Sequence, residues 1–371
     1  MDGMNGQMRE GNTAGYGTGG YMAADGQASM WQPQQPQQPD PGRMLKAARK
    51  HFSKLGGMYL LGTIVIIALQ SAVSAVALLL SPRWLTNGNT ALFLSMLPMY
   101  LVGMPVLILL VKTVPAERVE RRRIRPGQFI AAVVMAFGAV YLTNIVGNVI
   151  TLIIGMLKGG AVENQLASVT ESVSLWTIAF WMVLCAPVME EYVFRKMIVD
   201  RTVRYGEGPA VLVSGLMFGL FHGNLNQFVY AFALGMLLAY LYVKTGNLKI
   251  TIAIHMMINF MGGFVSSALT RAVDLDEYLD IVSTMDMPAM VAYLTKHMAG
   301  LMAYFIFLLF VLGSLIAGLV LFIVCLAKRK FFFAGRTAIP RGKKFRTVFL
   351  NVGMSLYIVF WTAVIIYTLI I

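Results

Sequence analysis

Three charged side chains stand together at the end of a long apolar stretch. Glu190, Glu191 and Arg195 belong to the motif V-M-E-E-Y-V-F-R at 188–195. On a helix, Glu191 and Arg195 lie on one face and can pair, whereas Glu190 is rotated by about 100° and can face a cavity. A charged side chain at bilayer depth costs roughly 2.5–3.5 kcal/mol. A chain that keeps three of them together is therefore expected to use them.

Two histidines and an asparagine occupy later apolar stretches. His222 follows Phe218 by four residues, and His255 precedes Asn259 by four, in a chain with only four histidines. A carboxylate can take a proton from water, imidazoles can position or donate protons, and an amide can stabilise an oxyanion. Taken singly, each histidine is better explained as a hydrogen-bonded core residue; for His255 and Asn259 this would be a hydrogen bond between helices, worth about 1 kcal/mol. Together with the carboxylates, they favour hydrolysis by an activated water.

Pro187 precedes the two glutamates by three residues. A proline inside a helix removes one hydrogen bond and usually kinks the segment, which would open a pocket beside the carboxylates. A second interpretation remains open at this point. Lys196, Asp200 and Arg201 follow the motif, so the charges could also mark a helix end solvated at the membrane interface.

The composition indicates an integral membrane protein. Of the 371 residues, 58% are hydrophobic and 13% are charged, against roughly 25% charged in a soluble domain. The net charge of +13 is concentrated in clusters beside apolar segments, which indicates membrane orientation and anionic headgroups rather than nucleic acid. Cys185 and Cys325 lie within apolar segments and offer neither a disulfide framework nor a metal-binding spacing.

Nine apolar segments approach the length of about 20 residues that a spanning helix needs. They cover residues 56–80, 91–111, 129–157, 175–199, 209–222, 225–243, 248–269, 300–327 and 347–371. Because spanning segments that are not barrels must be helical, the sequence predicts an all-α polytopic bundle of about eight or nine spans. The segment 209–222 is the shortest, so His222 could be re-entrant or lie in the middle of the membrane.

Four regions follow from this pattern. Residues 1–42 are rich in Gly, Gln, Asn and Pro and predict a disordered tail. Residues 43–174 hold the first three spans, 175–269 hold the charged and histidine motifs, and 270–371 hold an acidic loop, a basic loop and two more spans.

The distribution of basic residues predicts the orientation. If the N-terminus is cytoplasmic, the clusters at 43–54, 112–125, 201–204, 244–249 and 328–346 all lie inside. The acidic loop 271–297 and the C-terminus are then outside. One conflict remains: Glu190 is about 10–15 Å and His222 about 20 Å from the cytoplasmic side. Either the fifth segment is strongly tilted, or its boundary near 205–210 is misplaced.

The ordered motifs carry a resemblance to a known family. Glu190-Glu191-x-x-x-Arg195, Phe218-x-x-x-His222 and His255-x-x-x-Asn259 follow one another on successive segments. This order resembles the CPBP family of CAAX prenyl protease and bacteriocin-processing membrane endopeptidases, also called the Abi family. The resemblance covers about 175–265, and no motif residue departs from the pattern.

The resemblance implies a role for each motif residue. Glu190 would be the general base that activates water, assisted by His222. His255 and Asn259 would form the oxyanion site. Glu191 and Arg195 would hold the motif helix in place.

The metal requirement stays open at the level of sequence. Glu190, His222 and His255 could supply a carboxylate and two imidazoles to one Zn²⁺, with a free position for water. The sequence lacks the H-E-x-x-H pattern of many zinc proteases, which favours a mechanism without a cofactor. A cysteine mechanism through Cys185 has no evident partner residue.

The sequence therefore predicts a membrane endopeptidase that acts on a membrane-associated peptide or protein, of the CAAX or bacteriocin-precursor type. Its partners would be membrane lipid and that substrate, without nucleic acid. Two alternatives remain: a non-catalytic immunity or partner-binding protein on the same scaffold, and a transporter that uses Glu and His as a proton relay.

Overall fold

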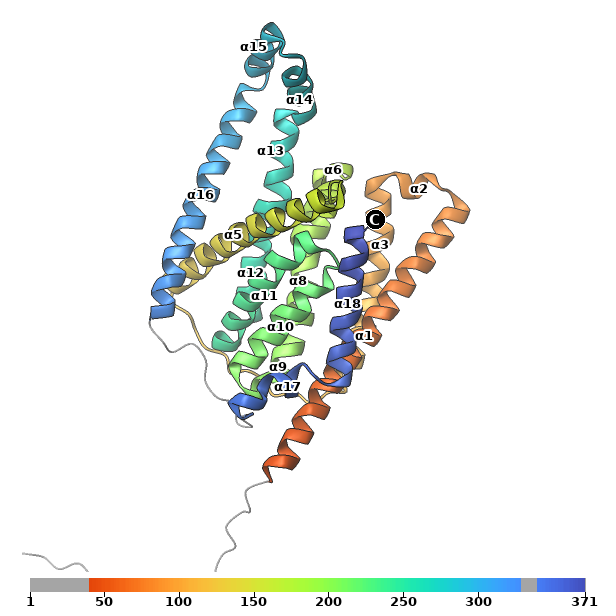
Figure 1. The fold of residues 1–371 in the computed structure, drawn as a ribbon, viewed down its shortest axis with the longest axis vertical. Coiled ribbons are helices and arrows are strands. Elements are labelled where there is room, and N and C mark those ends of the chain that lie inside the picture. Colours follow the sequence, from red (N-terminus) through yellow and green to blue (C-terminus); the bar gives the residue numbers. More distant parts are fainter. Residues whose placement is uncertain (1–39, 328–338, 371) are drawn as a thin grey trace, which may run out of the picture. The chain divides into compact units, whose positions relative to one another are not determined.

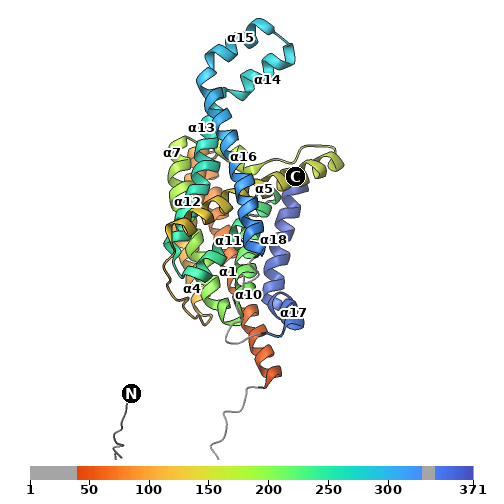
Figure 2. The same cartoon turned by 90° about the vertical axis from the view of Figure 1, so that its left-hand side faces the viewer.

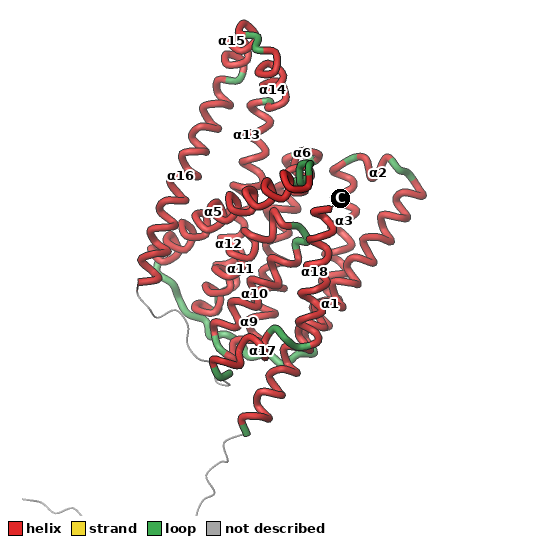
Figure 3. Tube along the Cα trace, in the orientation of Figure 1, coloured by secondary structure: helices red, strands yellow, loops and turns green. Residues whose placement is uncertain are grey.

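The computed structural model describes residues 40–327 and 339–370, which contain helices and no strand (Figure 3). The predicted all-α class is thus confirmed. The predicted tail 1–42 lies outside the described residues up to 39, and Pro41 and Gly42 already belong to the first helix. The first part of the basic loop 328–346, up to residue 338, also lies outside them.

The helices follow one another along the chain as labelled in Figure 1. They are α1 (Pro41–Leu80), α2 (Arg83–Thr86), α3 (Gly88–Pro98), α4 (Met104–Lys112), α5 (Pro126–Lys158), α6 (Gln165–Ser172), α7 (Leu175–Thr177), α8 (Ala186–Glu190), α9 (Ile198–Thr202), α10 (Glu207–Phe221), α11 (Leu225–Thr245), α12 (Leu248–Asn259), α13 (Ser266–Val273), α14 (Leu275–Thr284), α15 (Met287–Lys296), α16 (Met298–Ala327), α17 (Lys344–Val348) and α18 (Val352–Ile370). Four π-helical segments join some of them: η1 (Met99–Gly103), η2 (Ile178–Cys185), η3 (Glu191–Met197) and η5 (Phe260–Val265).

Within the described residues, eight helical stretches are long and apolar enough to cross a membrane. Helix α10, with 15 residues, corresponds to the fifth predicted segment and falls short of that length. The predicted number of eight or nine spans is confirmed. The first helix begins at Pro41, earlier than residue 56, because the basic stretch before the apolar run also forms helix, with proline at its first position.

The turn between the fourth and fifth segments lies further along the chain than predicted. The fourth span continues to Tyr205, and Gly206 makes the turn with a φ of 122° that favours glycine. Glu190 and His222 are each sixteen residues from Gly206. In an antiparallel helix pair, such residues lie at similar depth. The conflict in depth therefore came from the misplaced boundary at 199–209.

Within the described residues, the basic start of α1, α9 and α17 lie at one end of the bundle (Figure 1). The amide of Glu117 donates to the Asp200 carbonyl at 2.6 Å, and that of Arg122 donates to the Thr245 carbonyl at 2.8 Å. Lys54 at the start of α1 donates to the Thr113 carbonyl at 2.7 Å, and Arg49 donates to the Leu350 carbonyl at 2.8 Å. These bonds join segments that the sequence marked as positively charged.

The acidic stretch 271–297 projects beyond the bundle at the other end (Figure 2). The predicted acidic loop forms a hairpin of α14 and α15. Asp274 and Asp286 accept hydrogen bonds from the Glu277 and Ala289 amides. Aspartate is a favoured N-cap, so the acidic residues that suggested a loop also start its two helices.

The largest apolar core lies where α1 and α18 pack near α10 and the helical segment 188–195, which carries the two glutamates. The buried Tyr59 hydroxyl on α1 donates to the Val193 carbonyl at 2.6 Å. The buried Tyr357 hydroxyl on α18 donates to the Met217 carbonyl at 2.9 Å. The first and last spans thus position the two elements that carry Glu190 and His222.

Candidate active site

The glutamate pair lies between two irregular helical segments. Segment η2 ends at Cys185, and η3 begins at Glu191, with the single turn α8 between them. Such π-helical insertions are frequent at functional sites. The Ala186 amide donates to the Trp181 carbonyl, five residues back. In this register Pro187, which has no N–H, leaves the Met182 carbonyl without its backbone donor.

Asn259 supplies the missing donor. Its Nδ2 donates to the Met182 carbonyl at 2.8 Å, so it ties α12 to the segment in front of the glutamates. An amide nitrogen carries two hydrogens, and one of them is used here. The oxyanion role expected for Asn259 stays a prediction, and it requires the second hydrogen.

Glu191 and Arg195 form a fully buried ion pair. Both side chains are 0% exposed, and Arg195 Nη2 lies 3.1 Å from Glu191 Oε1. His255 Nδ1 lies 2.9 Å from the same oxygen. Since an ionised carboxylate only accepts hydrogen bonds, Nδ1 carries a proton and donates it. Glu191 therefore fixes both the motif helix and the orientation of His255.

The phenyl ring of Phe218 is the centre of this arrangement. The guanidinium carbon of Arg195 lies 4.0 Å from the ring centroid, a cation–π distance. The rings of His222 and His255 meet it edge-on, with centroids at 4.9 and 5.8 Å. In the sequence, Phe218 stands out only for its spacing from His222, which does not indicate that one ring contacts Arg195 and both imidazoles.

Glu190 is the accessible carboxylate of the pair. Its side chain is 18% exposed, and its Oε2 lies 3.7 Å from His255 Nε2. That distance exceeds a direct hydrogen bond. Glu190 thus keeps a free oxygen beside an imidazole whose other nitrogen is already committed to Glu191.

His222 stands at the C-terminal end of α10, where the chain reverses. Gly223, with a φ of 68°, makes the reversal, and the Asn224 side chain accepts from the Gln227 amide to start α11. His222 Nδ1 donates to the Phe218 carbonyl at 2.9 Å, which leaves Nε2 free. Glu190 and His255 are among the groups that act on His222 electrostatically.

Two tyrosines outside the sequence motifs lie near Glu190. Tyr100 and Tyr230 are both within electrostatic range of its carboxylate, and Tyr100 stacks on Trp181 with ring centroids 5.7 Å apart. Tyr100 belongs to the second span, far from the motifs in sequence. No spacing rule would have connected it with them.

The described residues contain no group of three or more His, Cys, Asp or Glu side chains arranged to hold a metal ion. Glu190, His222 and His255 are close to one another but do not form such a group.

Comparison with known proteins relates the middle of the chain to membrane peptidases. Residues 172–261 match the family model described as type II CAAX prenyl endopeptidase Rce1-like. The chain is 26% identical over 171 residues to a protein of Bacillus subtilis (strain 168) named "Putative membrane peptidase YdiL", covering 43% of this chain and 66% of that one. It is 33% identical over 93 residues to "Membrane-embedded CAAX protease MroQ" of Staphylococcus aureus (strain USA300), covering 23% and 36%. No solved structure matches significantly.

The matched region contains the whole candidate site, from Glu190 to Asn259. The chain spans just under two thirds of the length of one curated relative and about a third of the other. The similarity thus concerns the core that carries the motifs. Through this core, the chain is similar to the CPBP family of CAAX prenyl protease and bacteriocin-processing membrane endopeptidases.

Proposed function

We propose that this chain is an intramembrane endopeptidase that hydrolyses a peptide bond of a membrane-associated peptide or protein. One observation carries the proposal: two adjacent glutamates have different surroundings. Glu191 is 0% exposed and pairs with Arg195 and His255, whereas Glu190 is 18% exposed and keeps a free oxygen. A general base must reach both its substrate and water, and Glu190 meets that requirement.

In this mechanism, Glu190 takes a proton from a water held between it and His222 Nε2. The hydroxide attacks the scissile carbonyl carbon, and Glu190 passes the proton to the departing amine. Because His255 Nδ1 donates to Glu191, Nε2 donates to the developing oxyanion only when the imidazole is protonated. The buried carboxylate of Glu191 stabilises that cation. The second amide hydrogen of Asn259 completes the oxyanion site.

The orientation follows from the basic end of the bundle. We place that end in the cytoplasm, with the N-terminus, because positively charged loops are retained there. The C-terminal helix α18 ends at the opposite end (Figure 1), which agrees with a C-terminus outside. The relatives are named for peptidase and CAAX protease activity, so substrates of the CAAX or bacteriocin-precursor type are the first to test.

The decisive experiment compares Glu190→Gln with Glu191→Gln. Each removes one charge without changing the shape of the side chain. The purified proteins are reconstituted in liposomes with a library of membrane peptides, isoprenylated and not, and products are identified by mass spectrometry. We expect Glu190→Gln to reduce cleavage about 10²–10⁴-fold with unchanged thermal stability, and Glu191→Gln to reduce stability.

Cleavage by Glu190→Gln at the wild-type rate would contradict the proposed base. A partner-binding or immunity role survives that substitution without any peptide product. A transporter shows proton-coupled flux that the same substitution removes, again without product. Full activity after metal chelation excludes the zinc alternative, and inactivation that Zn²⁺ reverses supports it.

A further inference from the structure

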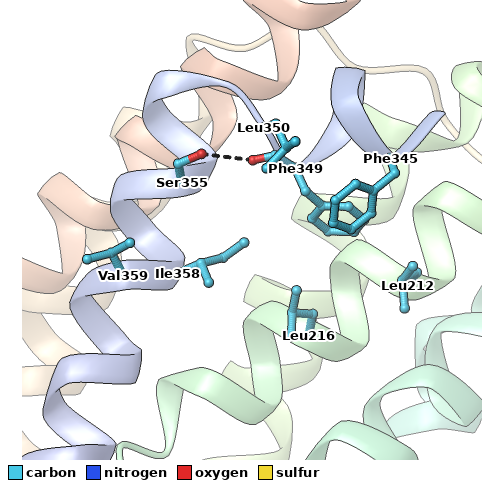
Figure 4. Close-up of a pocket in the computed structure, with 8 residues that line it drawn as sticks. All are labelled: Leu212, Leu216, Phe345, Phe349, Leu350, Ser355, Ile358 and Val359. Atoms are coloured by element: carbon cyan, nitrogen blue, oxygen red, sulfur yellow. Dashed lines mark hydrogen bonds between the residues drawn. The ribbon is translucent and has the colours of Figure 1, made fainter. Parts of the chain in front are cut away.

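An apolar groove lies on the outside of the bundle, between α10 and the pair α17–α18 (Figure 4). It encloses about 460 Å³. Its lining is formed by Leu212, Leu216, Phe345, Phe349, Leu350, Ser355, Ile358 and Val359. Four of these side chains, Leu212, Phe345, Leu350 and Val359, are exposed at its edge, so the groove opens sideways to the surroundings of the helices.

The groove is separate from the candidate active site. Leu216 is rotated by about 200° around α10 from Phe218, whose ring contacts both catalytic imidazoles. Leu212 precedes Leu216 by one turn on the same outer face. An occupant of this groove therefore does not reach Glu190.

The lining selects an apolar occupant. Ser355 contributes the one side-chain hydroxyl among the eight lining residues, and it donates to the Phe349 carbonyl at 3.0 Å (dashed in Figure 4). A polar ligand would lose its hydrogen bonds to water without gaining partners here. A hydrocarbon chain makes no hydrogen bonds to water, so it loses none when it enters the groove.

Basic residues next to the lining residues in sequence would select the headgroup. Lys344 and Arg346 flank Phe345, and Lys343 precedes them; Arg49 binds the carbonyl of the lining residue Leu350. Residues 339–370 include no acidic side chain. The groove opens at the basic end of the bundle. Basic pockets between spanning helices at that side of a membrane suit phosphate headgroups.

We propose that the groove binds one acyl chain of an anionic phospholipid, whose phosphate contacts Lys344 and Arg346. The apolar groove accounts for the chain, and the basic side chains on α17 account for the phosphate. Because α17 and α18 pack on α10, the bound lipid would brace the helix that ends in His222. This site is independent of the proposed peptidase activity.

The test measures lipid binding to the full chain in detergent by native mass spectrometry, without any peptide substrate. Phosphatidylglycerol is compared with phosphatidylcholine of identical chains, and with inorganic phosphate and glycerol phosphate. We expect phosphatidylglycerol to bind at least fivefold more tightly than phosphatidylcholine and to raise the melting temperature. The two soluble phosphates should have no effect, because they lack the chain.

Two variants locate the site. The pair Lys344→Gln with Arg346→Gln removes the charges, and Leu216→Trp fills the groove; each should lower phosphatidylglycerol binding at least fivefold. The matched controls are Arg121→Gln with Arg123→Gln in another basic loop, and Leu308→Trp on the exposed face of α16. Equal binding of the two lipids overturns the proposal. So do control variants that lose as much binding as the site variants, and so does stabilisation by the soluble phosphates alone.

Discussion

The span Leu225–Thr245 and the span Met298–Ala327 differ in what surrounds them. In its most apolar window, the first has 44% of its residues buried inside the protein, and the second has 6%. The second is also the more hydrophobic and has no charged residue. A helix that is apolar all round faces lipid, whereas the functional core needs polar side chains. Among the described spans, the most hydrophobic one therefore carries none of the motif residues.

The two regions are joined by a close crossing of α5 and α16. A Cβ atom on Gly318 would lie 2.8 Å from the Gly138 Cα atom, closer than two carbons can approach. Small residues at such a crossing let helix backbones pack directly. Gly138 and Gly318 thus hold the peripheral helix, while the buried ion pair holds the core. The following predictions test whether the two regions are separable.

The largest effect is expected from Arg195→Met in the core. Removing one partner of a buried ion pair leaves a buried charge on Glu191 and costs about 3–5 kcal/mol. Stability is measured by denaturation in SDS–detergent mixtures. The double variant with Glu191→Gln should recover part of the loss. The exposed pair Lys296–Glu277 of the hairpin is the control, and Lys296→Met should leave the midpoint unchanged. A tolerated Arg195→Met would show that the pair is not buried.

Gly318→Leu should release α16 from α5 at a local cost of about 1–3 kcal/mol from overpacking, without loss of peptidase activity. Disulfide cross-linking between engineered cysteines on the two helices measures the contact. Gly313→Leu on the same helix is the control, because a Cβ there meets no atom within 4 Å. Loss of activity in Gly318→Leu, but not in Gly313→Leu, would show that the peripheral helix supports the site.

The Asn259–Met182 hydrogen bond should depend on Pro187. Asn259→Ala is expected to cost about 1 kcal/mol. In a Pro187→Ala background it should cost less, because the new backbone amide can donate to the Met182 carbonyl. A double-mutant cycle on stability measures this coupling. Activity distinguishes the positioning role of Asn259 from its proposed oxyanion role. If Asn259 stabilises the oxyanion, Asn259→Ala should reduce activity by the same factor with and without Pro187→Ala. Equal stability losses in the two backgrounds would argue against the positioning role.

The smallest effect concerns the acidic hairpin. Hydrogen bonds from Lys296 and His297 lower the pKa of Glu277. The ionised Glu277 therefore stabilises the hairpin fully above the ordinary carboxyl pKa, and this stabilisation is lost as the pH falls through the lowered pKa. Spin-label distances between α14 and α15 should therefore increase only at strongly acidic pH. Glu277→Gln should remove this pH dependence, and the peptidase site should be unaffected. A distance change near neutral pH would implicate another group.

Much of the fold was predictable because membrane segments are long and apolar. The spans, the basic end and the family motifs were all read from local composition and spacing. The errors arose where boundaries depend on weak signals: the charged start of α1, the acidic helices α14 and α15, and the turn at Gly206. In each case, polar residues that suggested a loop lie within or cap a helix.

The sequence by itself determined that Glu190, Glu191, Arg195, His222, His255 and Asn259 follow one another on helices, because the pattern of four-residue spacing is local. Only the tertiary structure decided that Glu191 is the buried glutamate and Glu190 the accessible one. It also decided that the Phe218 ring contacts Arg195 and both imidazoles and that Asn259 binds the carbonyl left free by Pro187. These outcomes depend on which distant helices pack together. The local sequence of one helix does not specify which residues of other helices will contact it.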